Sequence, residues 1–405
     1  MFFIFLVLYV GLFIFFYRDP VLRVLLVFQV LSLLCAVLLN KEPIGDSIAS
    51  FLNFSFITFL NLLVILPWKG YSKKIFKIPS NLAKINRVTD FLCWISFFVA
   101  IILIITSILV LILVDDVNQF KYVEGVSEEF YYNALPFNAR YIILADYLYM
   151  LSYFLLPLHF FYLVVGDKKR AVKCLLFSLN IIFYGFTFFS RWTLLLYVSL
   201  FAAFWSMLND SLSIELFKKE KKVILISMAV ASVVFVTISV TRFDESYKMN
   251  YMSSASIVQN PTLYSFIDYL GMGNHQGVTL LNSYNGITLR GGYTFSITHN
   301  VLEWFGLSGK STVNNEMEKL FGDYYGSFIG FPTYTVYDFG YILSVILCLL
   351  YFFYVRSRNK YLSIQTLLVS GLLLIIPLST IFYSQANIVF FCLLVYFGIA
   401  LYLKI

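Results

Sequence analysis

Long apolar runs separated by short polar segments are the main feature of the chain. A helix that crosses a bilayer needs about 20 predominantly apolar residues. By that criterion we predict eleven membrane-spanning helices, at residues 2–17, 21–39, 48–68, 91–114, 141–165, 174–190, 192–208, 223–241, 333–355, 361–380 and 386–403. The pattern therefore predicts an all-α polytopic membrane protein.

The apolar stretch 174–208 contains two of these spans, and only Ser190 and Arg191 interrupt it. Basic segments flank it at 167–170 and 218–222. Because Lys and Arg collect in cytoplasmic loops, both segments are predicted to lie inside the cell. The chain between them must then cross the membrane an even number of times, which is why we divide the stretch into two spans.

Basic residues also concentrate in the loops 69–90 and 356–360. The basic loops alternate correctly with the predicted spans when the N-terminus lies outside the membrane and the C-terminus lies in the cytoplasm. The formal net charge of +7 then reflects topology, and it gives no reason to expect a nucleic-acid partner. The outer side carries a mildly acidic loop at 115–140.

One polar segment between spans, residues 242–332, is much longer than the others and is rich in Tyr, Asn, Gly and Ser. Within it, Asn260 followed by Pro261 is typical of a helix start, with Asn as the cap and Pro at the first helical position. A second amphipathic run covers 301–321. An ordered loop of this length is usually functional. The chain is thus predicted to have three parts: spans in 1–241, a large outer loop in 242–332 and spans in 333–405.

The amino-acid composition supports the membrane assignment. Hydrophobic residues make up 60% of the 405-residue chain and charged residues only 13%, with a mean hydropathy of +0.83. A soluble domain carries roughly 25% charged residues, so the chain has too little polar surface for a water-soluble protein of this size. The five Cys all lie in apolar runs and there are only three His, so we expect no disulfide framework and no metal site.

Charged residues at membrane depth are informative because each costs roughly 2.5–3.5 kcal/mol at a helix centre. Under the predicted topology they gather at or near the outer ends of spans: Arg140, Asp146, Arg191, Arg242 and Asp338. This placement predicts an outward-facing polar cavity beneath the long loop, and it disfavours an ion path through the bilayer. Any one of these arginines can instead extend its head group to lipid phosphate. Asp338 is expected to pair with an arginine.

Four short motifs follow one another along the chain. The first two are Phe189-Ser190-Arg191-Trp192-Thr193, between two central spans, and Thr241-Arg242-Phe243, where a span enters the long loop. The other two are Tyr269-Leu270-Gly271 leading to Arg290-Gly291-Gly292-Tyr293-Thr294-Phe295, and Tyr337-Asp338-Phe339-Gly340. In their order, spacing and predicted side of the membrane, these motifs resemble the Wzy-type O-antigen and capsule repeat-unit polymerases of bacteria.

The resemblance implies a membrane glycosyltransferase with a GT-C-like fold in the bacterial inner (cytoplasmic) membrane. Such enzymes join oligosaccharide repeat units carried on undecaprenyl pyrophosphate, at the outer face of that membrane. The growing chain moves from its lipid pyrophosphate to the non-reducing end of another lipid-linked unit. The partners implied are this lipid-linked oligosaccharide, the bilayer and a chain-length regulator protein. No cofactor and no metal are expected.

A lipid pyrophosphate donor requires cationic groups at the depth of the lipid head groups. A guanidinium can grip phosphate oxygens bidentately and offset the charge that develops on the leaving group. We therefore expect a pyrophosphate clamp formed by Arg140, Arg191, Arg242 and Arg290.

The acceptor hydroxyl needs a general base or an orienting acceptor, and the candidates are His299 and Asp338. Aromatic residues of the long loop are expected to stack on sugar rings: Tyr269, Tyr284, Tyr293 and Trp304. Anchoring of these rings at the membrane interface is an equally open alternative.

Three other functions stay open at this point. An O-antigen ligase would use the same donor but transfer the glycan to lipid A core, and its His-centred motif would lie in the large loop, where His275 and His299 are found. A flippase for the same lipid would place charges through the middle of its bundle and have short outer loops. A transporter would show inverted-repeat halves with broken spans near the midplane. The long outer segment and the one-sided charges favour the polymerase.

Overall fold

The structure is a computed structural model that describes residues 1–41, 47–79, 82–114, 130–131, 133, 135–138, 140–188, 190–208, 257–307, 312–322, 329–357, 361–380 and 383–403. Six helices of the described chain are long and apolar enough to cross a membrane, and four shorter apolar helices accompany them. By length and composition, these helices identify a mostly helical membrane protein, as the apolar runs predicted. The predicted span 223–241 lies outside the described residues, so the number of eleven spans stays a prediction.

The helices form two compact units, each assembled from separated parts of the chain. The first unit comprises Met1–Ile75, Phe243–Tyr361 and Leu373–Val395, and the second comprises Phe76–Arg242, Leu362–Leu372 and Tyr396–Ile405. The described parts of the segment 242–332, which the polar composition set apart as a loop, thus belong to the same unit as the N-terminal helices.

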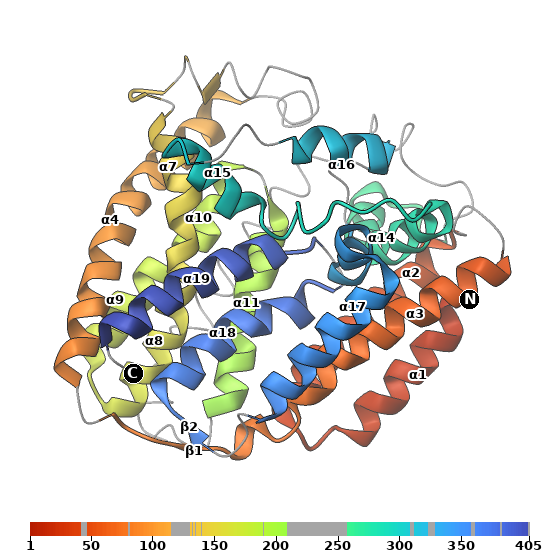
Figure 1. Ribbon diagram of the computed structural model, residues 1–405, viewed down its shortest axis with the longest axis horizontal. Helices are drawn as coiled ribbons and strands as arrows, with labels where there is room; N and C mark the ends of the chain where they lie inside the picture. The colour runs from red at the N-terminus through yellow and green to blue at the C-terminus, as the bar shows by residue number, and fades with distance from the viewer. Residues whose placement is uncertain are drawn as a thin grey trace. The chain divides into compact units, whose positions relative to one another are not determined.

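In the first unit, α1 (Phe2–Phe15) packs against α2 (Pro20–Leu39), and α3 (Ser47–Ile65) packs against α17 (Phe331–Ser357). Figure 1 shows the axes of these four helices roughly aligned. The unit also contains the second part of α18 and the first part of α19. Its elements are α1 (Phe2–Phe15), α2 (Pro20–Leu39), α3 (Ser47–Ile65), the short 3-10 helices η1 (Leu66–Trp68) and η2 (Tyr71–Lys73), α14 (Pro261–Ser283), α15 (Ser296–Trp304), α16 (Val313–Phe321), α17 (Phe331–Ser357), α18 (Ile364–Leu378) and α19 (Ala386–Leu403).

In the second unit, α8 packs against α9, and α10 packs against both α4 and α11. Its elements are α4 (Leu82–Leu113), α7 (Arg140–Leu148), the 3-10 helix η3 (Tyr149–Leu151), α8 (Ser152–Val165), α9 (Lys168–Ser178), α10 (Asn180–Thr187) and α11 (Arg191–Leu208), together with the remaining parts of α18 and α19. The two-residue strands β1 (Ile75–Phe76) and β2 (Tyr361–Leu362) form a small sheet.

Side-chain caps explain where two of the helices begin. The Asp19 carboxylate accepts a hydrogen bond from the Leu22 N–H at 3.2 Å at the start of α2. Asn260 does the same for α14, where its Oδ1 accepts the Leu263 N–H at 3.0 Å. In both helices a proline follows the cap, and there its missing N–H costs nothing. The predicted start of α14 is therefore confirmed.

The amphipathic run 301–321 does not form one helix. α15 ends at Trp304, and Gly306 follows with a φ of 68°. The Gly306 N–H donates to the Glu303 carbonyl and the Leu307 N–H donates to the Leu302 carbonyl, each at 2.9 Å. This pair of hydrogen bonds is the Schellman arrangement that terminates helices at glycine. The apolar spacing alone could not reveal the interruption.

α14 packs against the apolar helix α2 at a close crossing point. A Cβ atom at Gly271 would lie 2.7 Å from the Ala36 nitrogen and 2.8 Å from the Cys35 carbonyl carbon. At the same crossing, the Ser32 hydroxyl donates to the Leu270 carbonyl at 2.7 Å. Small residues allow the backbones of membrane helices to approach this closely. The segment with the polar composition of a loop is therefore partly built into the helical bundle of the first unit.

We expect Gly271→Val to destabilise the protein, because its side chain would meet the backbone of α2. Overpacking of this kind typically costs about 1–3 kcal/mol, and the melting temperature of the purified protein should fall accordingly. Gly11→Ala is the matched control, since a Cβ at Gly11 meets nothing within 4 Å and Ala is the better helix former. A Gly271→Val protein that melts like the wild type would contradict the close crossing.

The predicted break at Ser190 and Arg191 lies between α10 and α11. These two helices pack closely at Gly185, where a Cβ would clash with the Thr193 side chain of α11 and would lie 2.7 Å from the Ser190 carbonyl oxygen of the turn. The Ser190 N–H donates to the Gly185 carbonyl at 2.7 Å, and the Thr193 hydroxyl donates to the Ser190 carbonyl at 2.9 Å. The short turn is therefore fixed by local hydrogen bonds that pair its backbone groups.

Candidate functional site

α17 is interrupted at Gly340, whose φ is 78° and ψ is 170°. Glycine adopts such a backbone conformation readily, whereas a helix cannot continue through it, so carbonyls of the preceding turn lose their helical partners. Two of these carbonyls accept hydrogen bonds from the chain that follows α14. The Tyr337 carbonyl accepts the Leu289 N–H at 2.8 Å, and the Asp338 carbonyl accepts the Gly291 N–H at 3.1 Å.

The Asp338 side chain binds the same segment, residues 284–295, which we call the arginine loop. Its Oδ1 accepts the Tyr293 N–H at 3.0 Å, and its Oδ2 accepts the Thr294 N–H at 2.8 Å and the Thr294 hydroxyl at 2.6 Å. The side chain is fully buried, and a carboxylate needs such donors when it is buried. Within the described chain, backbone and hydroxyl donors bind Asp338 and it forms no ion pair with an arginine. Arg242 and the Arg191 side chain lie outside the described parts of the structure, so a pair with either of them stays a prediction.

The arginine loop turns sharply at Arg290, which has a φ of 54°, and at Gly291, which has a φ of 84°. Residues other than glycine seldom adopt such values, so the hydrogen bonds to α17 hold Arg290 in this conformation. A Cβ at Gly291 would lie 2.6 Å from the Phe295 ring, and a Cβ at Gly292 would lie 2.9 Å from the Leu289 carbonyl oxygen. A side chain at either position would clash with neighbouring atoms, so both positions require glycine.

The Arg290 side chain is exposed. Its guanidinium forms no ion pair with any acidic residue of the described chain. A guanidinium offers five N–H donors in a fixed planar arrangement that matches phosphate and carboxylate oxygens. An exposed guanidinium on a backbone fixed by a buried carboxylate is well suited to bind an anion.

Tyr293 is part of the scaffold of the loop. Its ring is buried and stacks on Tyr334 of α17 with the ring centroids 4.2 Å apart and an interplanar angle of 17°. Its hydroxyl donates to the Ser384 carbonyl, between α18 and α19, and the Ser384 N–H donates to the Ile329 carbonyl at 3.0 Å. In this arrangement neither face of the ring is presented to a ligand, which disfavours the predicted sugar stacking by Tyr293.

The other predicted loop residues differ in exposure. Tyr269 is buried in α14, whereas Trp304, at the end of α15, has 54% of its surface exposed. His299 lies in the first turns of α15, directly after the arginine loop, and is partly exposed. Of the aromatic residues predicted to stack on sugars, Trp304 is therefore available to a ligand and Tyr269 is not.

The remaining predicted arginines lie in other parts of the chain. Arg140 is exposed at the first position of α7, where its N–H donates to Asn138 Oδ1 at 2.9 Å. Arg191 is the first residue of α11. Both residues belong to the second unit, whereas Arg290 belongs to the first. Arg242 lies outside the described residues. Whether these arginines form one clamp stays a prediction.

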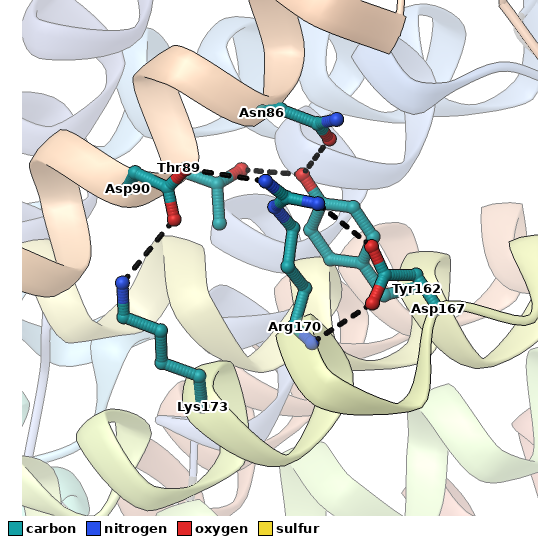
Figure 2. Close-up of polar contacts among 7 residues, drawn as sticks. All are labelled: Asn86, Thr89, Asp90, Tyr162, Asp167, Arg170 and Lys173. Carbon is teal, nitrogen blue, oxygen red and sulfur yellow. Dashed lines mark hydrogen bonds and ion pairs between the residues drawn. The ribbon is translucent and has the colours of Figure 1, made fainter.

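The second unit contains a separate charged cluster that joins α4 to α9 (Figure 2). Asp90 of α4 accepts hydrogen bonds from Lys173 at 3.2 Å and from Arg170 at 3.4 Å, and Arg170 also pairs with Asp167 at 2.8 Å. The Tyr162 hydroxyl, on α8, donates to an amide oxygen of α4 nearby. The charged side chains are between 31% and 45% exposed, so each pair stabilises the protein by at most about 1 kcal/mol. We interpret the cluster as structural.

Asp167 also caps α9, and this lowers the pKa of its carboxyl group. The Arg170 backbone N–H donates to the carboxylate, and the Arg170 guanidinium adds a second hydrogen bond and an opposite charge. A lowered pKa means that the folded state favours the ionised carboxylate. The stabilisation is therefore fully present at neutral pH and is lost as the pH falls through the lowered pKa.

Thr294 is the residue of the site that sequence analysis did not single out by itself. Its hydroxyl and N–H both bind Asp338, and the paired glycines before it were the available signal for a tight turn. In the described chain, no group of three or more His, Cys, Asp or Glu side chains is placed to hold a metal ion. No protein-family model matches the chain, and no curated protein or solved structure matches it either.

Proposed function

We propose that the protein is a membrane glycosyltransferase that polymerises oligosaccharide repeat units carried on undecaprenyl pyrophosphate, at the outer face of the bacterial cytoplasmic membrane. The observation that carries the proposal is the arginine loop. It presents an exposed guanidinium on a turn that a buried carboxylate of a membrane helix holds in place. Glycan transfer from a lipid pyrophosphate needs such a fixed cation beside the leaving group.

In this proposal Arg290 binds the pyrophosphate and stabilises the negative charge that grows on it as the glycosidic bond breaks. Asp338 acts as a positioning residue, because three donors already occupy its oxygens. His299, on α15, is then the remaining predicted candidate for the general base that takes the proton from the acceptor hydroxyl. Arg140, Arg191 and Arg242 would supply the rest of the cationic clamp, in a GT-C-like arrangement of eleven spans.

An O-antigen ligase is the second candidate. The observation that favours it is His299, which lies partly exposed on α15, in the segment where a ligase would have its His-centred motif. A ligase and a polymerase share the same donor, so the arginine loop serves both equally well. His275, by contrast, is buried, and its Nε2 lies 3.2 Å from the Ala36 carbonyl. A His-centred ligase motif would therefore depend on His299 rather than on His275.

The two candidates predict different products when the gene is deleted. Loss of a polymerase leaves a single repeat unit on the surface lipid, because ligation still proceeds. Loss of a ligase leaves no repeat unit there at all. Electrophoresis of the surface polysaccharide separates these outcomes, and a deletion strain with full-length polymer would contradict both.

We expect Arg191→Ala and Arg242→Ala each to abolish the ladder of polymer bands while the protein still inserts into the membrane. Each substitution removes a cation from the predicted clamp, and the remaining charges cannot replace its bidentate contacts. Immunoblots of the membrane fraction give the protein level. Arg87→Ala is the control, since Arg87 is exposed near the start of α4, in the segment 69–90 that is predicted to be cytoplasmic. Full-length polymer in both clamp variants would end the clamp hypothesis.

A further inference from the structure

Two partly exposed tyrosines of the first unit contact each other at the start of the arginine loop. Tyr284 follows the last residue of α14, and Tyr341 follows the kink of α17. Their ring centroids are 5.5 Å apart at an interplanar angle of 74°, so the edge of one ring meets the face of the other. Tyr337 lies buried beneath Tyr284, with the centroids 5.0 Å apart. The buried ring holds the outer pair in position.

Amide and hydroxyl groups continue from these rings onto α3 and α14. The Tyr341 hydroxyl donates to Asn53 Oδ1 at 3.1 Å, and Asn53 Nδ2 donates to Asn282 Oδ1 at 2.9 Å. Asn282 Nδ2 in turn donates to the Ser50 hydroxyl at 2.8 Å. Both asparagines are partly exposed. An asparagine amide has two N–H donors and two acceptor lone pairs, so these contacts leave one donor and one acceptor of Asn53 for a ligand.

The combination of groups indicates the chemistry of the ligand. Aromatic faces cover the apolar C–H face of a sugar ring, and amide groups bind the hydroxyls at its edge. Acyl chains of lipids have no hydrogen-bonding groups and could not pair with the remaining N–H and the remaining lone pair of the Asn53 amide. The cluster contains no charged side chain, which separates it from the anion-binding chemistry of Arg290.

We propose that Tyr284, Tyr341, Asn53 and Asn282 form a subsite for an uncharged sugar ring. The inference deepens the proposed function and rests on it for the identity of the glycan as part of the lipid-linked oligosaccharide. The subsite includes Tyr284, the first residue of the arginine loop. Thr288 of the same loop lies nearby, since a Cβ at Gly340 would lie 3.8 Å from the Tyr284 hydroxyl and 3.7 Å from Thr288. A sugar bound here would lie next to the loop whose arginine holds the pyrophosphate.

The test uses the full-length protein in lipid nanodiscs, because maltoside detergents carry sugar head groups that compete for such a site. The probe is a printed array of neutral and acidic oligosaccharides that lack both lipid and phosphate. The wild type is expected to bind neutral glycans, and the best of them is then titrated in solution. Tyr284→Ala should weaken that binding by at least about tenfold, as expected for a truncated aromatic anchor, and Tyr284→Phe should preserve most of it.

Tyr402→Ala is the matched control, since Tyr402 is 61% exposed on α19 and lies outside the subsite; its glycan binding should equal that of the wild type. Melting temperatures of all variants establish that they are folded. The inference is overturned if the wild type binds no neutral glycan, or if folded Tyr284→Ala and Asn53→Leu bind as well as the wild type. Neutral-glycan binding without polymer formation would instead overturn the proposed function and leave the subsite intact.

Discussion

Asp338→Asn is expected to release the arginine loop from α17 and to abolish polymer formation. The carboxylate accepts three hydrogen bonds from Tyr293 and Thr294, and an amide places an NH₂ donor against at least one of those donors. Hydrogen bonds to a charged group are worth about 1.5–3 kcal/mol each, and a buried donor without a partner adds a penalty. We therefore expect a loss of roughly 2–4 kcal/mol in stability, measured by thermal unfolding in nanodiscs.

Two substitutions at Thr294 separate the role of the hydroxyl from that of the backbone. Thr294→Ser keeps the hydroxyl that binds Asp338 and should support normal polymer, whereas Thr294→Val removes only this bond and should show an intermediate loss. The graded series follows from the geometry, because both Thr294 variants keep the Thr294 N–H bond to Asp338, which is 2.8 Å long in the wild type. Wild-type stability and wild-type polymer in Asp338→Asn would contradict the positioning role.

Arg290→Ala is expected to eliminate polymer without lowering the melting temperature. The side chain is exposed and makes no ion pair within the described chain, so its removal leaves no buried group without a partner. Alanine carries the same left-handed backbone strain as arginine at this position, so that cost cancels in the comparison. Removing a preorganised donor at a developing anion typically lowers turnover by about 10²–10³-fold. The rate of glycan transfer in purified protein measures this directly.

Arg290→Lys tests whether charge alone is sufficient. A lysine ammonium keeps the positive charge but cannot form the bidentate contact, so we expect partial activity between the wild type and Arg290→Ala. Lys319→Ala is the control for a general loss of positive charge in the same unit, because Lys319 is exposed on α16. Equal losses in Arg290→Ala and Lys319→Ala would indicate a non-specific electrostatic effect rather than a binding site.

The helical membrane character was predictable because it depends on local properties of the chain. Apolar runs of sufficient length can satisfy their backbone in a bilayer only as helices, and polar caps such as Asn260 specify where a helix begins. The same reasoning located the tight turn at Ser190, since a short polar interruption between two apolar runs has few alternatives. Gly306 also interrupts the sequence, but apolar residues at helical spacing on both sides of it indicated a continuous amphipathic run. Its role in ending α15 was therefore not predicted.

The partner of Asp338 was not predictable from the sequence. A buried carboxylate can be satisfied by a guanidinium or by neutral donors, and both kinds of group occur in the same short segment, at Arg290 and at Thr294. Only the backbone turn at Gly291 decides between them, because it directs the N–H groups toward α17 and leaves the arginine exposed. Likewise, a glycine in a polar segment is usually interpreted as part of a loop, whereas Gly271 serves the close crossing of α14 and α2.

The most direct test of the account is elongation of a defined undecaprenyl-pyrophosphate-linked repeat unit by the purified protein in liposomes. We expect products two or more units long from the wild type and from Lys319→Ala. Arg290→Ala should leave the substrate unextended, although this variant melts at the wild-type temperature. A folded wild-type protein that never extends the unit, or an Arg290→Ala protein that extends it at the wild-type rate, would contradict the account.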